Sequence, residues 1–241
     1  MTPDITADPP RRRFRHWKRW LVVGILTVAV LAVAGPYVYI HFIEGPAPAR
    51  FSLSKTKSSS KTTAGAVPTV GTWKITGGSQ AGYRIGEVLF GQTNTAVGRT
   101  TAVTGQMSIS ASNTVDTASV TVDLTKVSSD QSQRDNQFQG RIMNTSQFPT
   151  TTFTLTSPVA LGNLPAAGTT VNANGTGTLN LHGTTRAVQA ALSARETGRT
   201  IQVSGSIPIT FADWNISNPS GGPARANDHG IIEFLLTFEH P

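Results

Sequence analysis

The chain has 241 residues, contains no cysteine and carries a formal net charge of +7. The missing cysteine excludes disulfides, a lipoprotein cysteine, thiolate catalysis and cysteine-based metal sites. The charge is uneven: residues 1–68 hold ten Lys and Arg against three Asp and Glu, whereas residues 69–241 hold ten of each sign. A neutral C-terminal part disfavours nucleic-acid binding and indicates a membrane-topology signal joined to a neutral domain.

The first predicted element is a membrane-spanning helix. A basic tail, residues 1–19, precedes residues 20–43, in which Asp, Glu, Lys and Arg do not occur. A helix of this length would measure about 36 Å, more than the ~30 Å of a bilayer's hydrocarbon core. Tryptophans lie near its first end and tyrosines near its second, as aromatic residues do at membrane interfaces.

A cleaved signal peptide is the alternative interpretation of this segment. Ala32-Val33-Ala34 has the small-x-small pattern of a cleavage site. The apolar run continues to Ile43, however, which favours an uncleaved anchor. Six Lys and Arg precede the span and four follow it within about 20 residues, which favours a cytoplasmic N-terminus and an external C-terminal domain.

Residues 44–70 form a predicted flexible linker, because Ser, Thr, Lys, Gly, Ala and Pro dominate and apolar periodicity is absent. The low lysine content and the many Thr, Ala and Gly residues hint at a bacterial source. We therefore expect a single-pass protein of a bacterial plasma membrane, with its domain outside the cell membrane.

Residues 71–241 form one predicted all-β domain. Apolar and polar residues alternate in several segments, each of which thus has one apolar and one polar face, as in an antiparallel sheet with one wet side. Eight or so such strands predict a sandwich or a closed barrel. The clearest segments are residues 118–124, 151–156, 176–181, 188–192, 201–211 and 233–239.

Two features interrupt the predicted strands. His182-Gly183-Thr184-Thr185 reads as the turn of a hairpin. In residues 128–145, Phe138 and Ile142 lie four apart among polar residues, after Ser128-Ser129-Asp130 as a possible cap. This pattern predicts a short helix that packs on the sheet or closes a barrel mouth.

Four stretches in this domain resemble motifs of the YceI-like family of lipid-binding proteins, in the family's order. They are Gly82-Tyr83-Arg84-Ile85 with Gly98 and Gly105; Val127-Ser128-Ser129-Asp130 through Arg134-Asp135 to Phe148-Pro149 and Phe153; Gly177 to Arg186; and Ile209-Thr210-Phe211-Ala212-Asp213-Trp214.

The resemblance implies a lipocalin-like antiparallel barrel of about eight strands, with a helix near its opening. It also implies a long apolar cavity that holds a polyisoprenoid or a similar long-chain amphiphile. An eight-stranded barrel is either filled by side chains or just wide enough for one ligand, and alternation does not distinguish the two.

The inward faces of the predicted strands supply the candidate ligand-binding residues. They are Val120, Val122, Leu124, Phe153, Leu155, Leu179, Leu181, Val188, Leu192, Ile207, Ile209, Phe211, Phe234, Leu236 and Phe238.

Three polar residues are candidate contacts for a lipid headgroup. Arg84 lies in an alternating run and faces either the cavity mouth or solvent. Arg134 is either part of a headgroup clamp, since Arg binds phosphate bidentately, or a structural ion-pair residue. His182 either meets a headgroup or is an ordinary turn residue.

Catalytic and metal-binding motifs are missing from the sequence. It has neither a Gly-x-Ser-x-Gly elbow nor a His-Glu-x-x-His motif, and the three histidines of the domain are poorly spaced for a metal. We expect no cofactor and no enzymatic activity. The leading prediction is a membrane-tethered lipid-binding module. The alternatives are a structural or interaction domain of the cell envelope with a filled barrel, and an enzyme that acts on a lipid.

Overall fold

The computed structural model describes residues 17–38, 46–53, 69–161, 168–221 and 224–240. The chain divides into two units, Met1–Pro46 and Ala47–Pro241. Most of the predicted basic tail, the end of the predicted span and residues 54–68 of the predicted linker lie outside the described residues.

The N-terminal unit contains helix α1, Trp17–Val38. Its 22 residues correspond to about 33 Å at 1.5 Å per residue. Among the described residues it is the one helix long and apolar enough to cross a membrane, a test that an anchor and a signal sequence both pass. The hydroxyl of Thr27 donates to the carbonyl of Val23 at 2.9 Å, so this polar group is satisfied within the helix.

The second unit is built from β-strands. Their bounds are β1 Gly71–Ile75, β2 Gln80–Leu89, β3 Gln92–Thr100, β4 Val103–Ile109, β5 Thr114–Asp123, β6 Thr150–Leu155, β7 Val159–Ala160, β8 Thr170–Leu181, β9 Thr184–Thr197, β10 Thr200–Thr210, β11 Ala224–Ala226 and β12 His229–Glu239.

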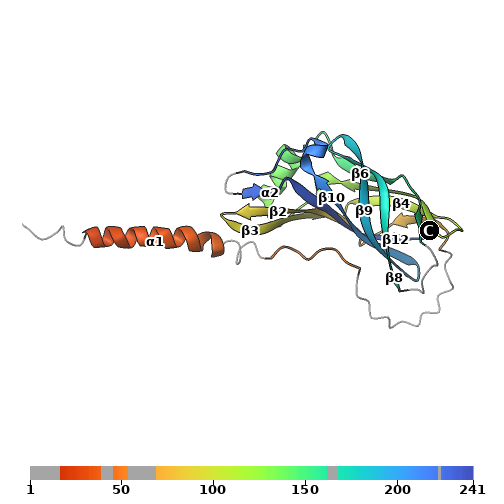
Figure 1. The fold of residues 1–241 in the computed structure, drawn as a ribbon, viewed down its shortest axis with the longest axis horizontal. Helices are drawn as coiled ribbons and strands as arrows, with labels where there is room; N and C mark the ends of the chain where they lie inside the picture. The colour runs from red at the N-terminus through yellow and green to blue at the C-terminus, as the bar shows by residue number, and fades with distance from the viewer. Residues whose placement is uncertain (1–16, 39–45, 54–68, 162–167, 222–223, 241) are drawn as a thin grey trace, which may run out of the picture. The chain divides into compact units, whose positions relative to one another are not determined.

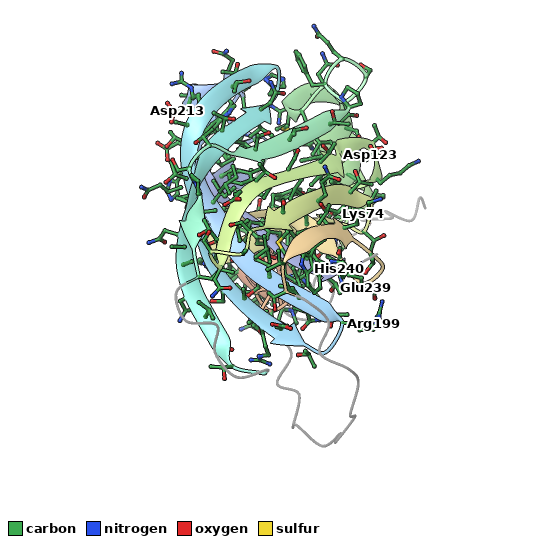
Figure 2. All side chains as sticks on the ribbon, turned by 90° about the vertical axis from the view of Figure 1, so that its right-hand side faces the viewer. Lys74, Asp123, Arg199, Asp213, Glu239 and His240 are labelled. Carbon is green, nitrogen blue, oxygen red and sulfur yellow. The ribbon has the colours of Figure 1, made fainter. Side chains whose placement is uncertain are left out.

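Within the described residues, eight of these strands close into an antiparallel barrel in the order β1-β4-β5-β6-β8-β9-β10-β12 (Figure 1). The barrel closes where β1 pairs with β12, with Lys74 opposite Glu239; Figure 2 labels both residues on the same side of the barrel. Strand β12 pairs with β1 at its C-terminal end and with β2 nearer its start. The predicted eight-stranded all-β barrel is confirmed.

Alternation along the strands decides which side chains face inward. On β12, Phe234 lies opposite Gly205 of β10. A Cβ atom at Gly205 would come within 2.6 Å of the Phe234 ring, and one at Gly177 of β8 would come within 2.5 Å of the Phe153 ring. Glycine at these two positions therefore lets large aromatic rings lie flat against the inner wall.

A helical insert connects β5 to β6. It consists of η2 Leu124–Lys126, α2 Ser132–Gln137 and η3 Phe138–Ile142, which confirms the short helix predicted in residues 128–145. The predicted cap at Ser128-Ser129-Asp130 is wrong, because the helix begins after Gln131 without a side-chain cap. Instead, the Asp135 carboxylate accepts hydrogen bonds from the backbone N–H and the hydroxyl of Ser129, both at 2.7 Å.

Two apolar clusters lie along the barrel. One joins the helical insert to η4, Phe211–Trp214, at what we call the capped end; its members are Leu124, Val127, Phe138, Met143, Leu179, Leu181, Phe211, Trp214 and Ile216. The other includes Trp73, Met107, Ile201 and Phe238 and lies toward what we call the open end, where β9 turns into β10. Figure 2 shows Asp213 of η4 and Arg199 of that turn at opposite ends of the barrel.

Candidate functional site

An apolar cavity occupies the barrel interior, with a volume of about 190 Å³. Inward side chains of β4, β5, β6, β8, β9, β10 and β12 line it. Ten of the predicted ligand-binding residues belong to this lining: Val120, Val122, Phe153, Leu155, Leu179, Leu192, Ile207, Phe234, Leu236 and Phe238.

The shape of the cavity suits an elongated guest. On β12 its lining extends from Ile232 to Phe238, about 20 Å along the strand at 3.3 Å per residue. A strand tilt of about 40° reduces this to roughly 15 Å along the barrel axis. Small side chains keep the interior from filling, among them Ala118, Ala190 and Ala194.

Most polar members of the lining lie at the open end. Arg195 and Glu196 belong to the end of β9 and Thr169 directly precedes β8, and we call these three residues the rim. The Arg195 guanidinium donates to the Thr170 hydroxyl at 2.9 Å. Deeper in the cavity, the hydroxyl of Thr151 donates to the carbonyl of Asn180 at 2.7 Å and is thereby satisfied. The arrangement is an apolar tube with a charged mouth.

The other five predicted ligand-binding residues lie at the capped end. They are Leu124, Leu181, Val188, Ile209 and Phe211, which pack with the helical insert and Trp214. The inward alternation continues there, but the insert supplies Phe138 and Met143, which fill the space. The insert therefore closes the end opposite the charged rim, whereas the family resemblance had placed a helix near the opening.

The three predicted headgroup contacts are absent from the described lining of the cavity. Arg84 lies on the outer face, where its Nε is 3.2 Å from Glu233 Oε2. His182 occupies a two-residue turn at the capped end; its Nδ1 is 3.1 Å from the Trp214 carbonyl and its ring packs edgewise on Phe148.

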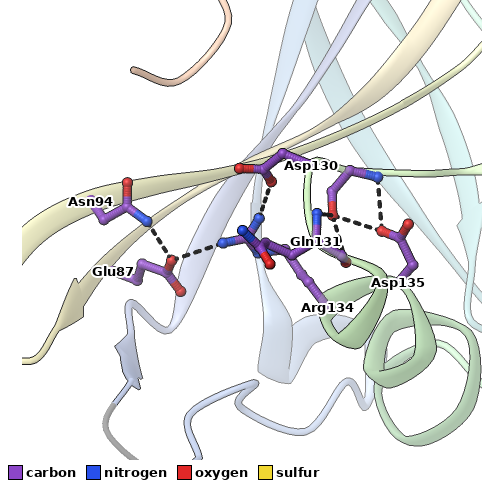
Figure 3. A network of polar contacts seen from close by, with 7 residues as sticks. Glu87, Asn94, Asp130, Gln131, Arg134 and Asp135 are labelled. Carbon is purple, nitrogen blue, oxygen red and sulfur yellow. Dashed lines mark hydrogen bonds and ion pairs between the residues drawn. The ribbon is translucent and has the colours of Figure 1, made fainter. Parts of the chain in front are cut away.

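Arg134 belongs to a polar network outside the barrel, shown in Figure 3. It pairs with Asp130 one helical turn earlier and with Glu87 of β2 at 3.4 Å. Asn94 of β3 donates to the same Glu87 carboxylate at 2.9 Å. The network ties the β2–β3 hairpin to α2, which makes Arg134 a structural ion-pair residue.

Sequence reasoning missed a buried ionic cluster on the outer face. Glu233 of β12 is only 3% exposed, and it pairs with Arg84 and with Arg99, whose Nη2 is 2.7 Å from Glu233 Oε1. The sequence did contain one signal of this cluster, the acidic residue Glu233 inside the apolar run of β12. The arginines come from β2 and β3, so their proximity depends on the barrel register.

A segment of the predicted linker, residues 46–53, lies across this cluster, and we call it the strap. The Arg84 guanidinium donates to the Pro48 carbonyl at 2.6 Å, and that of Arg99 donates to the Ala49 carbonyl. The Phe51 ring lies 4.0 Å from the Arg99 guanidinium carbon, a cation–π contact. Leu53 is buried. Two arginines thus fasten the chain between α1 and the barrel to the outer wall.

The pKa values of Tyr83 and Asp123 are shifted by their local surroundings. Burial raises the pKa of Tyr83, which stacks on Phe138 with ring centroids 5.1 Å apart. A hydrogen bond from the Thr125 hydroxyl lowers the pKa of Asp123 at the start of η2. Among the described residues, three metal-binding side chains do not come together at any point.

The comparisons with known proteins agree with this architecture. A family model described as the YceI-like domain matches residues 73–238, more than half of the chain. The chain belongs to the YceI-like family. No curated protein matches it.

Several solved structures resemble this chain. A polyisoprenoid-binding domain from Saccharophagus degradans has a TM-score of 0.55 and 17% identity, over 71% of this chain and 99% of that one. BcnA from Burkholderia cenocepacia has a TM-score of 0.49 and 20% identity, over 64% of this chain and 95% of that one. The Campylobacter jejuni YceI protein has a TM-score of 0.44 and 16% identity, over 60% and 84%. At 17% identity, the likeness to the Saccharophagus degradans domain concerns the fold alone.

Proposed function

We propose that this YceI-like protein binds a polyisoprenoid or a similar long-chain amphiphile in its barrel and holds it beside a bacterial plasma membrane. The cavity carries this proposal: an apolar tube about 15 Å long that ends at a charged rim matches a lipid with a long tail and a polar head. The likeness to a polyisoprenoid-binding domain supports the choice of ligand class.

The affinity of such a site would come from the lipid tail. Burial of each methylene group contributes about 0.8 kcal/mol, so ten methylene equivalents would contribute about 8 kcal/mol. That corresponds to a Kd near 1 µM before the entropic cost of association is deducted. Because the lining is apolar, chain length rather than hydrogen bonding would dominate selectivity. Arg195, Glu196 and Thr169 are the groups placed to meet a polar head.

The membrane part of the proposal rests on α1. We propose that it stays in place as a single-pass anchor, with a cytoplasmic N-terminus and the barrel outside. Apolar side chains cover α1 on all sides, and a helix of this kind is stable when lipid or protein covers it. Anchoring would keep the cavity close to the bilayer that supplies its lipid.

The test is mass spectrometry of organic extracts from the full chain purified from membranes. A cavity ligand would remain stoichiometric with protein through repeated detergent exchange, whereas phospholipid that surrounds α1 would decline with each exchange. A retained prenyl species would support the proposal and name the ligand. A preparation in which every lipid declines together would argue for an empty or filled barrel.

A further inference from the structure

The tip of the β2–β3 hairpin has an unusual turn. Leu89 pairs with Gln92, which leaves Phe90 and Gly91 as a two-residue turn with φ of 50° and 80°. Asn, Asp or Gly normally occupies the first position of such a turn, because positive φ is unfavourable for other side chains. Phe90 is 50% exposed, and the neighbouring Val88 is 40% exposed.

Residue type or local contacts explain the other described non-glycine residues with positive φ, but not Phe90. Three of them are asparagines, which tolerate this conformation: Asn113, Asn144 and Asn215. The fourth, His182, is held by the Trp214 carbonyl and the Phe148 ring. Phe90 instead presents an aromatic ring to the outside at a strained position, which points to a partner beyond the fold.

The hairpin and the strap extend along the same part of the barrel. From Arg84, which holds Pro48, strand β2 continues six residues to Phe90, about 20 Å in the direction of the capped end. Arg84 lies opposite Ile231 of β12. Arg99, which contacts the Ala49 carbonyl and the Phe51 ring, lies opposite Gly82, and Gly82 lies opposite Glu233, nearer the open end of β12. The strap therefore runs from the capped side at Pro48 toward the open side at Phe51.

The chain length between the apolar segment and the strap limits where the membrane lies. The apolar run ends at Ile43, and Glu44 is the next residue. Pro48 is four positions after Glu44 in the chain, which corresponds to a reach of at most about 14 Å. At a strand tilt of about 40°, the hairpin extends roughly 15 Å beyond the same point along the barrel axis. This length is about equal to the reach of the tether, so the hairpin tip can touch the membrane surface when the capped end faces it.

We propose that the β2–β3 hairpin tip, through Phe90 and Val88, inserts into the interface of the lipid bilayer that α1 spans. This inference rests on the anchoring proposed above. Insertion of the hairpin tip would turn the capped end of the barrel toward the membrane and the charged rim away from the membrane. Lipid would then leave the cavity on the side that faces away from the anchoring membrane.

The charges around the tip suit a bilayer with anionic headgroups. Arg225 of β11 is exposed and lies directly opposite Val88. The nearby Glu87 carboxylate is paired with Arg134 and accepts a hydrogen bond from Asn94 (Figure 3). An apolar tip flanked by a cation is the composition of an interfacial anchor.

The test uses the natural absence of cysteine. Phe90→Cys and Val88→Cys, each labelled with a polarity-sensitive fluorophore, report on the tip, and Arg199→Cys reports on the opposite end (Figure 2). The full chain is reconstituted into vesicles of zwitterionic and anionic phospholipid that contain a nitroxide-labelled lipid. Val88→Cys retains ordinary strand geometry, so the readout does not depend on the strained turn alone.

We expect blue-shifted emission and strong nitroxide quenching at positions 88 and 90, with neither effect at position 199. Flotation of the vesicles separates the two proposals. Protein that floats with water-exposed labels at positions 88 and 90, or with quenching at position 199 instead, overturns the hairpin proposal and leaves the anchor intact. Protein that does not float overturns the anchoring and, with it, the orientation.

Discussion

Glu233 offers the sharpest test of how the strap is fastened. Its carboxylate is almost fully buried on the outer wall and neutralises part of the charge of two guanidinium groups. Glu233→Gln keeps the shape of the side chain and removes its charge. Arg84 and Arg99, whose side chains are 10% and 24% exposed, would then lose their counter-charge inside the cluster.

The expected cost follows from the burial of the cluster. Removal of one partner from a buried ion pair typically costs 3–5 kcal/mol, and the partial exposure of Arg99 places this case near the lower end, at about 3 kcal/mol. For a domain of this size each 1 kcal/mol lowers Tm by roughly 2–4 °C, so we expect a decrease of about 6–12 °C. Urea denaturation and thermal melting of the full chain measure both values.

The strap gives a second readout of the same change. When the arginines lose Glu233, their hold on the Pro48 and Ala49 carbonyls weakens. Trypsin should then cut after Arg50 faster than in the unmodified chain, and mass spectrometry identifies this cut.

The matched control is Asp130→Asn, which removes a carboxylate that is 47% exposed and pairs with Arg134 one turn away. Such a pair contributes about 0.3–0.5 kcal/mol. The reasoning would be refuted if Glu233→Gln lowered the free energy of unfolding as little as Asp130→Asn does and left the rate of trypsin cleavage after Arg50 unchanged.

Two further predictions concern the barrel wall and its capped end. Gly177→Ala should destabilise the domain by about 1–3 kcal/mol, because the new methyl group would come within 2.4 Å of the Thr154 carbonyl. Gly140 has open space around it, so Gly140→Ala should change the free energy of unfolding far less. Urea titrations of the two variants compare these effects. Burial raises the folded-state pKa of Tyr83 above the ordinary value near 10, so this group favours folding below pH 10 and the benefit is lost as pH rises above it. Tyr83→Phe should flatten the alkaline decline of stability, and an unchanged slope between pH 8 and pH 11 would contradict this assignment.

The strands and their inward faces were predictable from the sequence because a barrel wall repeats one local rule. Apolar and polar residues alternate with a period of two, so Phe153, Phe234 and Leu236 could be placed inside before the topology was known. The turn at His182 and the short helix that contains Phe138 also follow from local pattern.

The boundary between the cavity and the filled end was not predictable in this way. Leu179 and Leu181 follow the same alternation on β8, yet only Leu179 reaches the cavity. The difference depends on where Phe138 and Trp214 pack, which is a tertiary property of residues far along the chain. Arg84 and Glu233 are 149 residues apart, so their ion pair forms only once β2 pairs with β12.

The most direct test of the central claim compares bound lipid in three forms of the full chain. Ala194 lines the cavity and Ala187 is exposed, and both lie on β9. Ala194→Phe would place a ring inside the cavity, whereas Ala187→Phe would place the same ring outside it. Mass spectrometry of extracts, normalised to protein, should find a stoichiometric long-chain lipid in the unmodified chain and in Ala187→Phe, and little in a folded Ala194→Phe. Equal lipid in all three forms, or none in the unmodified chain, would contradict the proposed lipid site.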